Sequence, residues 1–167
     1  TYTRPKFEEF NEIAFVSFKM LGIDPSTREV ISEQVSMVHG QKWLISFQEK
    51  EGDLFDGFRQ RLKENKSSVR RKDTSYLLYR LMDIVVDNYF LVLEHISDRS
   101  EELEDEAILN SDMSVVQKVH ALKKELNIVR KAVAPLHEVV LKMYKDEGGF
   151  EDSLKHHIHD MLEHIKQ

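Results

Sequence analysis

The stretch "DTSYLLYRLMDIVVDNYFLVLEHISDRSEELEDE", from Asp73 to Glu106, contains neither glycine nor proline. Its apolar residues recur at intervals of three and four, which is the pattern of an amphipathic helix. We therefore expect one continuous helix over residues 74–107. At a rise of about 1.5 Å per residue this helix is roughly 50 Å long, so it projects beyond any small domain that it packs against. Its expected apolar stripe comprises Leu77, Leu78, Leu81, Ile84, Val85, Leu91, Val92 and Ile96.

A second long helix is expected over residues 113–146, after the short connection "LNSDMS". Its apolar residues follow a heptad spacing, which is typical of a helix that packs along another helix. Two long helices with a short connection favour an antiparallel helical hairpin. After "DEGG" (146–149), the segment "FEDSLKHHIHDMLEHIKQ" begins a third helix that reaches the last residue. The expected seam of the second helix comprises Val119, Leu122, Leu126, Val129, Val133, Leu136, Val140 and Met143.

Three β-rich runs precede these helices, over residues 12–21, 28–38 and 42–48. The turns "GIDPST" and "HGQ" join them, and their shortness favours antiparallel neighbours. The first run is apolar at both odd and even positions, which indicates a strand covered on both faces. The segment "DLFDGFRQRLKEN" then predicts a short helix on the sheet, with Asp53 as its N-cap.

These elements divide the chain into three expected parts. Residues 1–72 hold the sheet and the short helix, residues 73–146 the helix pair, and residues 147–167 the start of a further helix. The expected fold class is α/β of the α+β type: a three-stranded antiparallel sheet followed by a long antiparallel helical hairpin. Because the chain begins without methionine and ends inside a helical pattern, we expect it to be a piece of a longer protein.

Composition and motifs argue against several classes of protein. The formal net charge is −6, and "RRK" (70–72) is the one basic cluster, which argues against a nucleic-acid partner. The sequence has no cysteine, no export leader and no apolar run long enough to span a membrane, so the default location is the cytosol. Phosphate-binding, dinucleotide-binding and serine-nucleophile motifs are absent, so we do not expect an enzyme.

Two aspartates, Asp83 and Asp87, stand one helical turn apart beside the apolar stripe of the first long helix. A carboxylate near an apolar surface needs a partner, because burying an unpaired charge is costly. One interpretation is a salt bridge or capping contact with a basic residue of the neighbouring helix. The other is a hard cation such as Mg²⁺, which one or two carboxylates and several waters typically hold.

Two further groups of polar residues could bind cations. The acidic run from Glu94 to Glu106 is typical of a solvated helix face, and it could also concentrate divalent cations without a fixed site. Near the end of the chain, one helical face carries His156, Asp160, Glu163 and His164. These side chains could hold a softer metal, although the HExxH pattern of zinc hydrolases is absent and such histidines are more often simply exposed.

Several stretches together resemble the cytoplasmic domain of the CorA family of magnesium and cobalt transport proteins. They are "RPKFEEFNEIAFVSFKML", "SEQVSMVHGQKWLISFQEKEGDLFDGFRQRL", "YLLYRLMDIVVDNYFLVLEHISDRSEELEDE" and "LKKELNIVRKAVAPLHEVVLKMY". They follow one another in the family's order and cover nearly the whole chain.

The resemblance implies the regulatory domain of a homopentameric channel in the cell membrane. In that family an αβα sandwich carries a pair of acidic "willow" helices and continues into a stalk helix that enters the membrane. The resemblance implies that Mg²⁺, or Co²⁺ in its place, binds between neighbouring cytoplasmic domains and holds the pentamer closed. The membrane helices and their Gly-Met-Asn signature are absent here, so we expect that this chain alone does not conduct ions.

The resemblance also implies metal-binding positions. Asp83, in "RLMDIVVD", matches the family's sensing aspartate on this helix. Asp160, in "HHIHDMLEH", matches the stalk-helix aspartate that bridges to the next subunit. That alignment requires a one-residue gap after Tyr144, so Glu163 and His164 stay alternatives. A further acidic partner is expected before Thr1.

Two other functions are compatible with these residues. The histidine cluster would suit a ZntB-like zinc transporter, since imidazole favours Zn²⁺ over Mg²⁺. The heptad seam alone would suit a helical-hairpin adaptor that docks a partner helix and senses no ion.

Overall fold

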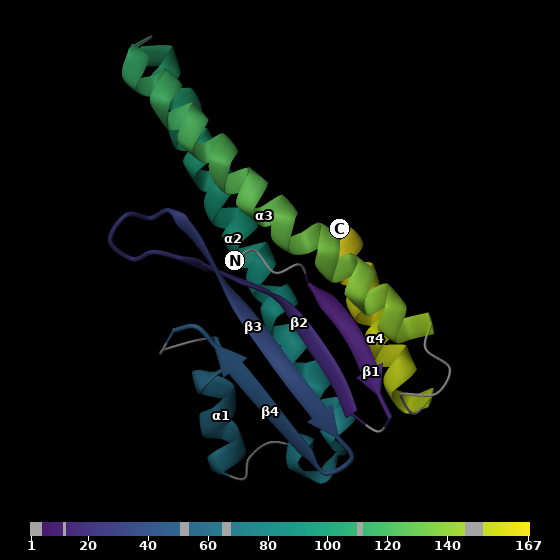
Figure 1. The fold of residues 1–167 in the computed structure, drawn as a ribbon. Helices are drawn as coiled ribbons and strands as arrows, with labels where there is room; N and C mark the ends of the chain where they lie inside the picture. The colour runs from purple at the N-terminus through teal and green to yellow at the C-terminus, as the bar shows by residue number, and fades with distance from the viewer. Residues whose placement is uncertain (1–4, 12, 51–53, 65–67, 110–111, 146–151) are drawn as a thin grey trace.

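The computed structural model describes residues 5–11, 13–50, 54–64, 68–109, 112–145 and 152–167. In chain order its elements are β1 (Lys6–Phe10), β2 (Ile13–Ile23), β3 (Val30–Gly40), β4 (Trp43–Gln48), α1 (Asp56–Lys63), the 3₁₀ turn η1 (Ser68–Arg71), α2 (Thr74–Leu109), α3 (Met113–Lys145) and α4 (Asp152–Lys166). Figure 1 shows a sheet with α2 behind it and a helix pair that extends past its edge. The α+β class expected from the sequence is confirmed.

The sheet has one strand more than the sequence predicted. Its four strands are antiparallel in the order β1-β2-β3-β4, with Phe7 opposite Val16 and Val16 opposite Met37. Strand β1 escaped prediction because it is only five residues long and three of these are charged. Its burial does not alternate, because Phe7 is its one buried residue, and the pairing with β2 is what defines it as a strand. Asn11, in a left-handed conformation with φ of 56°, begins the tight turn to β2.

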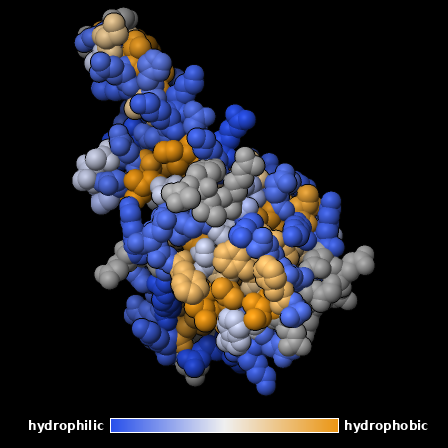
Figure 2. Space-filling view, viewed as in Figure 1, coloured by the Kyte–Doolittle hydropathy of each residue, from blue (hydrophilic) through white to orange (hydrophobic). Residues whose placement is uncertain are grey.

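One face of the sheet is covered by helices. Its inner residues, all buried, are Ala14, Val16, Phe18, Met20, Val35 and Met37. Helices α2 and α3 both contact β2 and β3. The opposite face displays Ile13, Ile45 and Phe47, which are between 41% and 57% exposed, and Figure 2 shows apolar side chains gathered over the strands on this side. On the opposite face of β2, Ser17 and Leu21 are buried as well, so the two-sided burial that the sequence pattern predicted holds over part of the strand.

The two long helices match their expected bounds to within two residues, and α3 continues through Pro135. The expected seam is correct at Leu122, Val129 and Leu136, which are buried, but wrong at Val119 and Leu126, which are 52% and 46% exposed. In the first long helix Leu91 is likewise 60% exposed. The reason is geometric. A straight α-helix has about 3.6 residues per turn, whereas a heptad pattern repeats every 3.5 residues, so a strict heptad stripe drifts around the helix.

Helix α1 buries Phe55 and Phe58 as its pattern predicted. It starts at Asp56, and Phe55 occupies the N-cap position without a side-chain cap. The expected cap, Asp53, lies outside the described residues. Among the described helices, none combines the length and the apolar character needed to cross a membrane.

Candidate metal centre between helices α2 and α4

Aromatic contacts set the register between α4 and α2. The His157 ring stacks on Tyr79 with 5.0 Å between centroids and meets the edge of Tyr76 at 5.3 Å. Ile158, Met161 and Leu162 are buried on the same helix, so α4 is anchored along its length. The two helices run in the same direction, and His164 therefore lies about two turns beyond His157, opposite the next turns of α2.

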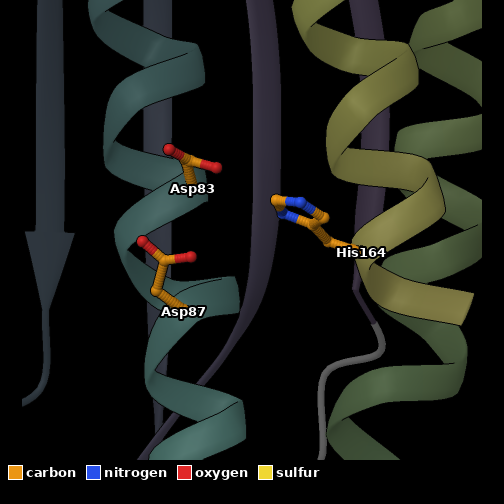
Figure 3. A group of neighbouring side chains, drawn as sticks. All are labelled: Asp83, Asp87 and His164. Carbon is orange, nitrogen blue, oxygen red and sulfur yellow. The ribbon is translucent and has the colours of Figure 1, made fainter. Parts of the chain in front are cut away.

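This register brings three potential metal ligands together. Asp83 and Asp87 project from successive turns of α2, and His164 projects from α4, so that their ligand atoms all lie within 4.8 Å of one another. Figure 3 shows the His164 imidazole pointing across the helix interface toward both carboxylates. A single divalent cation is small enough to contact all three groups after minor side-chain rotation.

Asp83 is the buried member of the group, with 7% of its surface exposed. Burial raises the pKa of its carboxyl group, and the neighbouring Asp87 carboxylate raises it further. Arg80, His164 and the Tyr79 hydroxyl act in the opposite direction and lower the pKa. The carboxylate forms an ion pair with Arg80, one turn earlier on its own helix. The salt bridge considered from the sequence thus exists, but with α2 itself and not with the neighbouring helix.

The pKa of Asp83 stays raised even though Arg80 is beside it. The positive charge of Arg80 therefore does not fully offset burial and the repulsion from Asp87. A divalent cation between the carboxylates would favour their ionised forms. Asp87 and His164 are exposed, so water can complete the coordination shell.

The donor set is mixed. Two carboxylates suit Mg²⁺ and Mn²⁺, whereas an imidazole suits Co²⁺ and Zn²⁺. From the sequence, the Asp83–Asp87 pair was one interpretation of a cation site, and the resemblance assigned Asp83, with His164 as an alternative ligand, but not Asp87. Their meeting depends on the packing of α4 on α2, which a one-dimensional pattern does not specify.

The structure does not place the other expected ligands in this group. Asp160 is half-buried on α4, with its Oδ2 3.6 Å from Nε2 of His156 on the same helix. Glu163 is exposed and accepts a hydrogen bond of 2.7 Å from Lys166 Nζ. Within the described chain, Asp83, Asp87 and His164 form the one group of at least three such side chains. The four polar residues that share a face of α4 therefore do not converge on one point.

The acidic run on α2 is largely a solvent-facing surface. Glu102 pairs with Arg28 at 3.3 Å, and Glu106 pairs with Lys118 of α3 at 2.6 Å. These pairs are exposed and contribute little to stability.

The chain matches the family model "CorA-like Mg2+ transporter protein" over residues 1–167, and it belongs to that family. It is similar to the cobalt/magnesium transport protein CorA of Thermotoga maritima, with 41% identity over 145 residues that make up 87% of this chain and 41% of that protein. It is also similar to the putative metal ion transporter YfjQ of Bacillus subtilis, with 23% identity over 163 residues, which are 97% of this chain and 50% of that protein. The chain thus spans half or less of these curated relatives.

Solved structures show the same fold. The soluble domain of CorA from Methanocaldococcus jannaschii superposes with a TM-score of 0.85 at 17% identity, covering 98% of this chain and 65% of that chain. The ZntB cytoplasmic domain from Vibrio parahaemolyticus superposes with a TM-score of 0.79 at 18% identity, covering 99% of this chain and 64% of that chain. These structures confirm the fold, and the family model and the Thermotoga relative confirm the family resemblance deduced from the sequence.

Proposed function

We propose that this chain is the ion-sensing cytoplasmic part of a membrane transporter for Mg²⁺ and Co²⁺. One observation carries the proposal: Asp83, Asp87 and His164 gather within 4.8 Å in a chain of the CorA-like Mg²⁺ transporter family. In this proposal Mg²⁺ is both the regulatory ligand and the transported ion, and Co²⁺ is an alternative cargo. The longer protein is a homopentamer in the cell membrane.

The physical basis is an electrostatic latch. Without a cation, Asp83 and Asp87 repel each other, and with one, both carboxylates and His164 share a ligand that joins α2 to α4. Residues 147–167 are proposed as the start of the stalk that leads to the membrane, residues 73–146 as the sensing helix pair, and residues 1–72 as the sheet that supports them. Occupancy would hold the stalk against the pair and favour the closed pentamer.

Asp160 has a separate role in this proposal. It lies on α4, outside the group of three ligands, and remains partly exposed. We assign it to the contact with a neighbouring subunit, with Glu163 as the alternative. Binding at each site stabilises the closed state by RT ln(1 + [L]/Kd), about 1.4 kcal/mol at roughly tenfold excess, so several weak sites around a ring can set the balance.

The test is hydrogen exchange of the full-length transporter with and without millimolar Mg²⁺. We expect Mg²⁺ to slow exchange in α4 and in the Asp83–Asp87 turns, and we expect Asp83→Asn, Asp87→Asn and Asp160→Asn each to reduce this protection. Asp105→Asn, in the exposed acidic run, removes one negative charge as the other three variants do, and it should leave the protection intact. If Mg²⁺ protects all four variants as well as it protects the parent, ion sensing at these residues is rejected. If Mg²⁺ does not slow exchange in the parent, the helical-hairpin adaptor is favoured.

A second candidate, zinc transport, is favoured by the presence of His164 in the group. Competition between Zn²⁺ and Mg²⁺ distinguishes the two functions. If His164→Asn abolishes Zn²⁺ binding and Mg²⁺ protection is absent, the ligand is zinc. If His164→Asn leaves Mg²⁺ protection largely in place, the carboxylates hold the ion and magnesium is supported.

A further inference from the structure

The loop between β2 and β3 is held in a defined conformation at its tip. Asp24 Oδ1 accepts hydrogen bonds from the backbone N–H groups of Ser26 and Thr27, at 2.8 and 3.1 Å. Arg28 then adopts a left-handed conformation with φ of 60°, which is unfavourable for a residue with a Cβ atom. Such a conformation persists only where surrounding contacts fix it.

Helix α2 supplies part of those contacts. The carbonyl oxygen of Arg28 accepts hydrogen bonds from His95 Nε2 at 2.8 Å and from Arg99 Nη1 at 3.1 Å. The Arg28 side chain also reaches Glu102, at 3.3 Å, although both groups are exposed. The two α2 donors lie one helical turn apart and point toward the same carbonyl.

Helix α3 completes the arrangement through Glu125, which is 4% exposed. Glu125 Oε2 accepts hydrogen bonds from Arg99 Nη1 at 2.6 Å and from the Val30 N–H at 3.0 Å. One carboxylate oxygen therefore joins α2, α3 and the first residue of β3. Charged hydrogen bonds in a buried setting are short and directional, so they fix an orientation more sharply than apolar packing does.

We propose that Arg99 and Glu125 form a lock that fixes the direction of the projecting helix pair relative to the sheet. We call residues 103–109 and 113–121, at the far end of α2 and α3, the arm. Figure 1 shows this part of the pair extending past the loop and beyond the sheet. The ion pair between Lys118 and Glu106, within the arm, is exposed and joins the two helices to each other and not to the sheet. The lock lies where the arm leaves the sheet.

With the lock closed, arm and loop move as one body, and a displacement of the arm reaches β2 and β3 directly. With the lock open, the remaining polar links from α2 to the loop are the His95 hydrogen bond and the exposed Arg28–Glu102 pair, and Glu125 is left as a buried charge without its cationic partner, which is costly. This role does not depend on the metal centre, because Arg99 is twelve residues beyond Asp87, about 18 Å along the helix. Arg99 and Glu125 are positioning residues and not ligands.

The test measures the distance between two spin labels by pulsed electron resonance. The chain has no cysteine, so Glu104→Cys in the arm and Ser32→Cys on β3 accept labels selectively. We expect Arg99→Met and Glu125→Gln to broaden the distance distribution at least about twofold, and to speed hydrogen exchange at Val30 at least about tenfold. Lys118→Met, which removes an exposed pair inside the arm, is the matched control and should leave both readouts unchanged.

Two outcomes would overturn the lock. One is a distribution in Arg99→Met that is as narrow as in the parent. The other is equal broadening in Lys118→Met, which would assign the effect to general loosening of the helix pair. If Glu125→Gln does not fold, Arg99→Met and Arg99→Lys decide the question. The lysine variant keeps the positive charge, so its distance distribution should be narrower than that of Arg99→Met. Metal titration of the same variants should be normal, which separates this test from that of the ion site.

Discussion

His164 of α4 faces Asp83 of α2 across a helix interface, and their ligand atoms lie within 4.8 Å of each other. This relationship joins α4 to the N-terminal third of α2, the long helix that supports the sheet. It also brings an imidazole beside a carboxylate whose pKa is raised by burial. A cation bound at this point would act on the contact between α2 and α4.

The stacked pair of Tyr79 and His157 should hold α4 in place. Replacing His157 with Ala removes a ring contact of 5.0 Å, and aromatic pairs of this kind contribute about 0.5–1.5 kcal/mol. We expect faster hydrogen exchange across residues 154–166 in this variant. His156→Ala, which truncates a neighbouring side chain that is 78% exposed, should exchange like the parent. Similar exchange in both variants would show that the stacking does not anchor α4.

The buried His39 should make the fold sensitive to acid. Its Nε2 lies 3.1 Å from Thr74 Oγ1 and 3.2 Å from Ser75 Oγ at the start of α2. Burial lowers the pKa of His39, and Asp73 opposes this only partly. The unfolded chain therefore takes up a proton at a higher pH than the folded chain does. The stabilisation is complete above about pH 6.5 and is lost as the pH falls through the lower folded pKa.

Urea unfolding near pH 7.5 and near pH 5 measures this effect. The free energy of unfolding should fall more steeply with acid in the parent than in His39→Gln. His120→Gln, which changes an exposed histidine of α3, should follow the parent. The same slope in all three proteins would exclude His39 as the source.

Alanine substitutions at two glycines should change the stability of the fold in opposite directions. A Cβ atom at Gly40 would lie 2.5 Å from Cε2 of Trp43, so Gly40→Ala should displace the indole and cost about 1 kcal/mol. A Cβ atom at Gly57, in α1, meets nothing within 4 Å, so Gly57→Ala should stabilise the fold by about 0.5–1 kcal/mol. Thermal melts report both changes, and the emission of the single tryptophan should shift only in Gly40→Ala. Unchanged emission in that variant would contradict the close approach.

The observed burial in α3 predicts unequal effects of two leucines that the heptad spacing treats alike. Leu136 is fully buried and Leu126 is 46% exposed. Leu136→Ala should therefore destabilise the fold by about 2–5 kcal/mol, and Leu126→Ala by less than about 1 kcal/mol. Denaturant titrations of both variants check the difference. Equal losses would support the original heptad seam instead.

The sequence predicted those features that depend on local pattern. The period of the apolar residues located both long helices, and the short connections indicated the antiparallel hairpin and the three longer strands. The prediction failed at β1, whose five residues include three charges and show no alternation of buried and exposed positions. It also failed at Leu126 and Leu91, where the rotation of each helix depends on its neighbours. The spacing of Asp83 and Asp87 was readable, but the approach of His164 was not. That approach depends on how Tyr79 and His157 set one helix against another.

The most direct measurement is the position of a bound ion on the chain itself. Substoichiometric Mn²⁺ accepts the same oxygen and nitrogen donors as the proposed ligands and broadens the nuclear resonance of nearby amides. We predict broadening centred on Asp83, Asp87 and His164, which excess Mg²⁺ reverses and which the double change Asp83→Asn, Asp87→Asn abolishes. Broadening confined to the acidic run at residues 101–106, and unaltered in the double variant, would contradict a metal centre between α2 and α4.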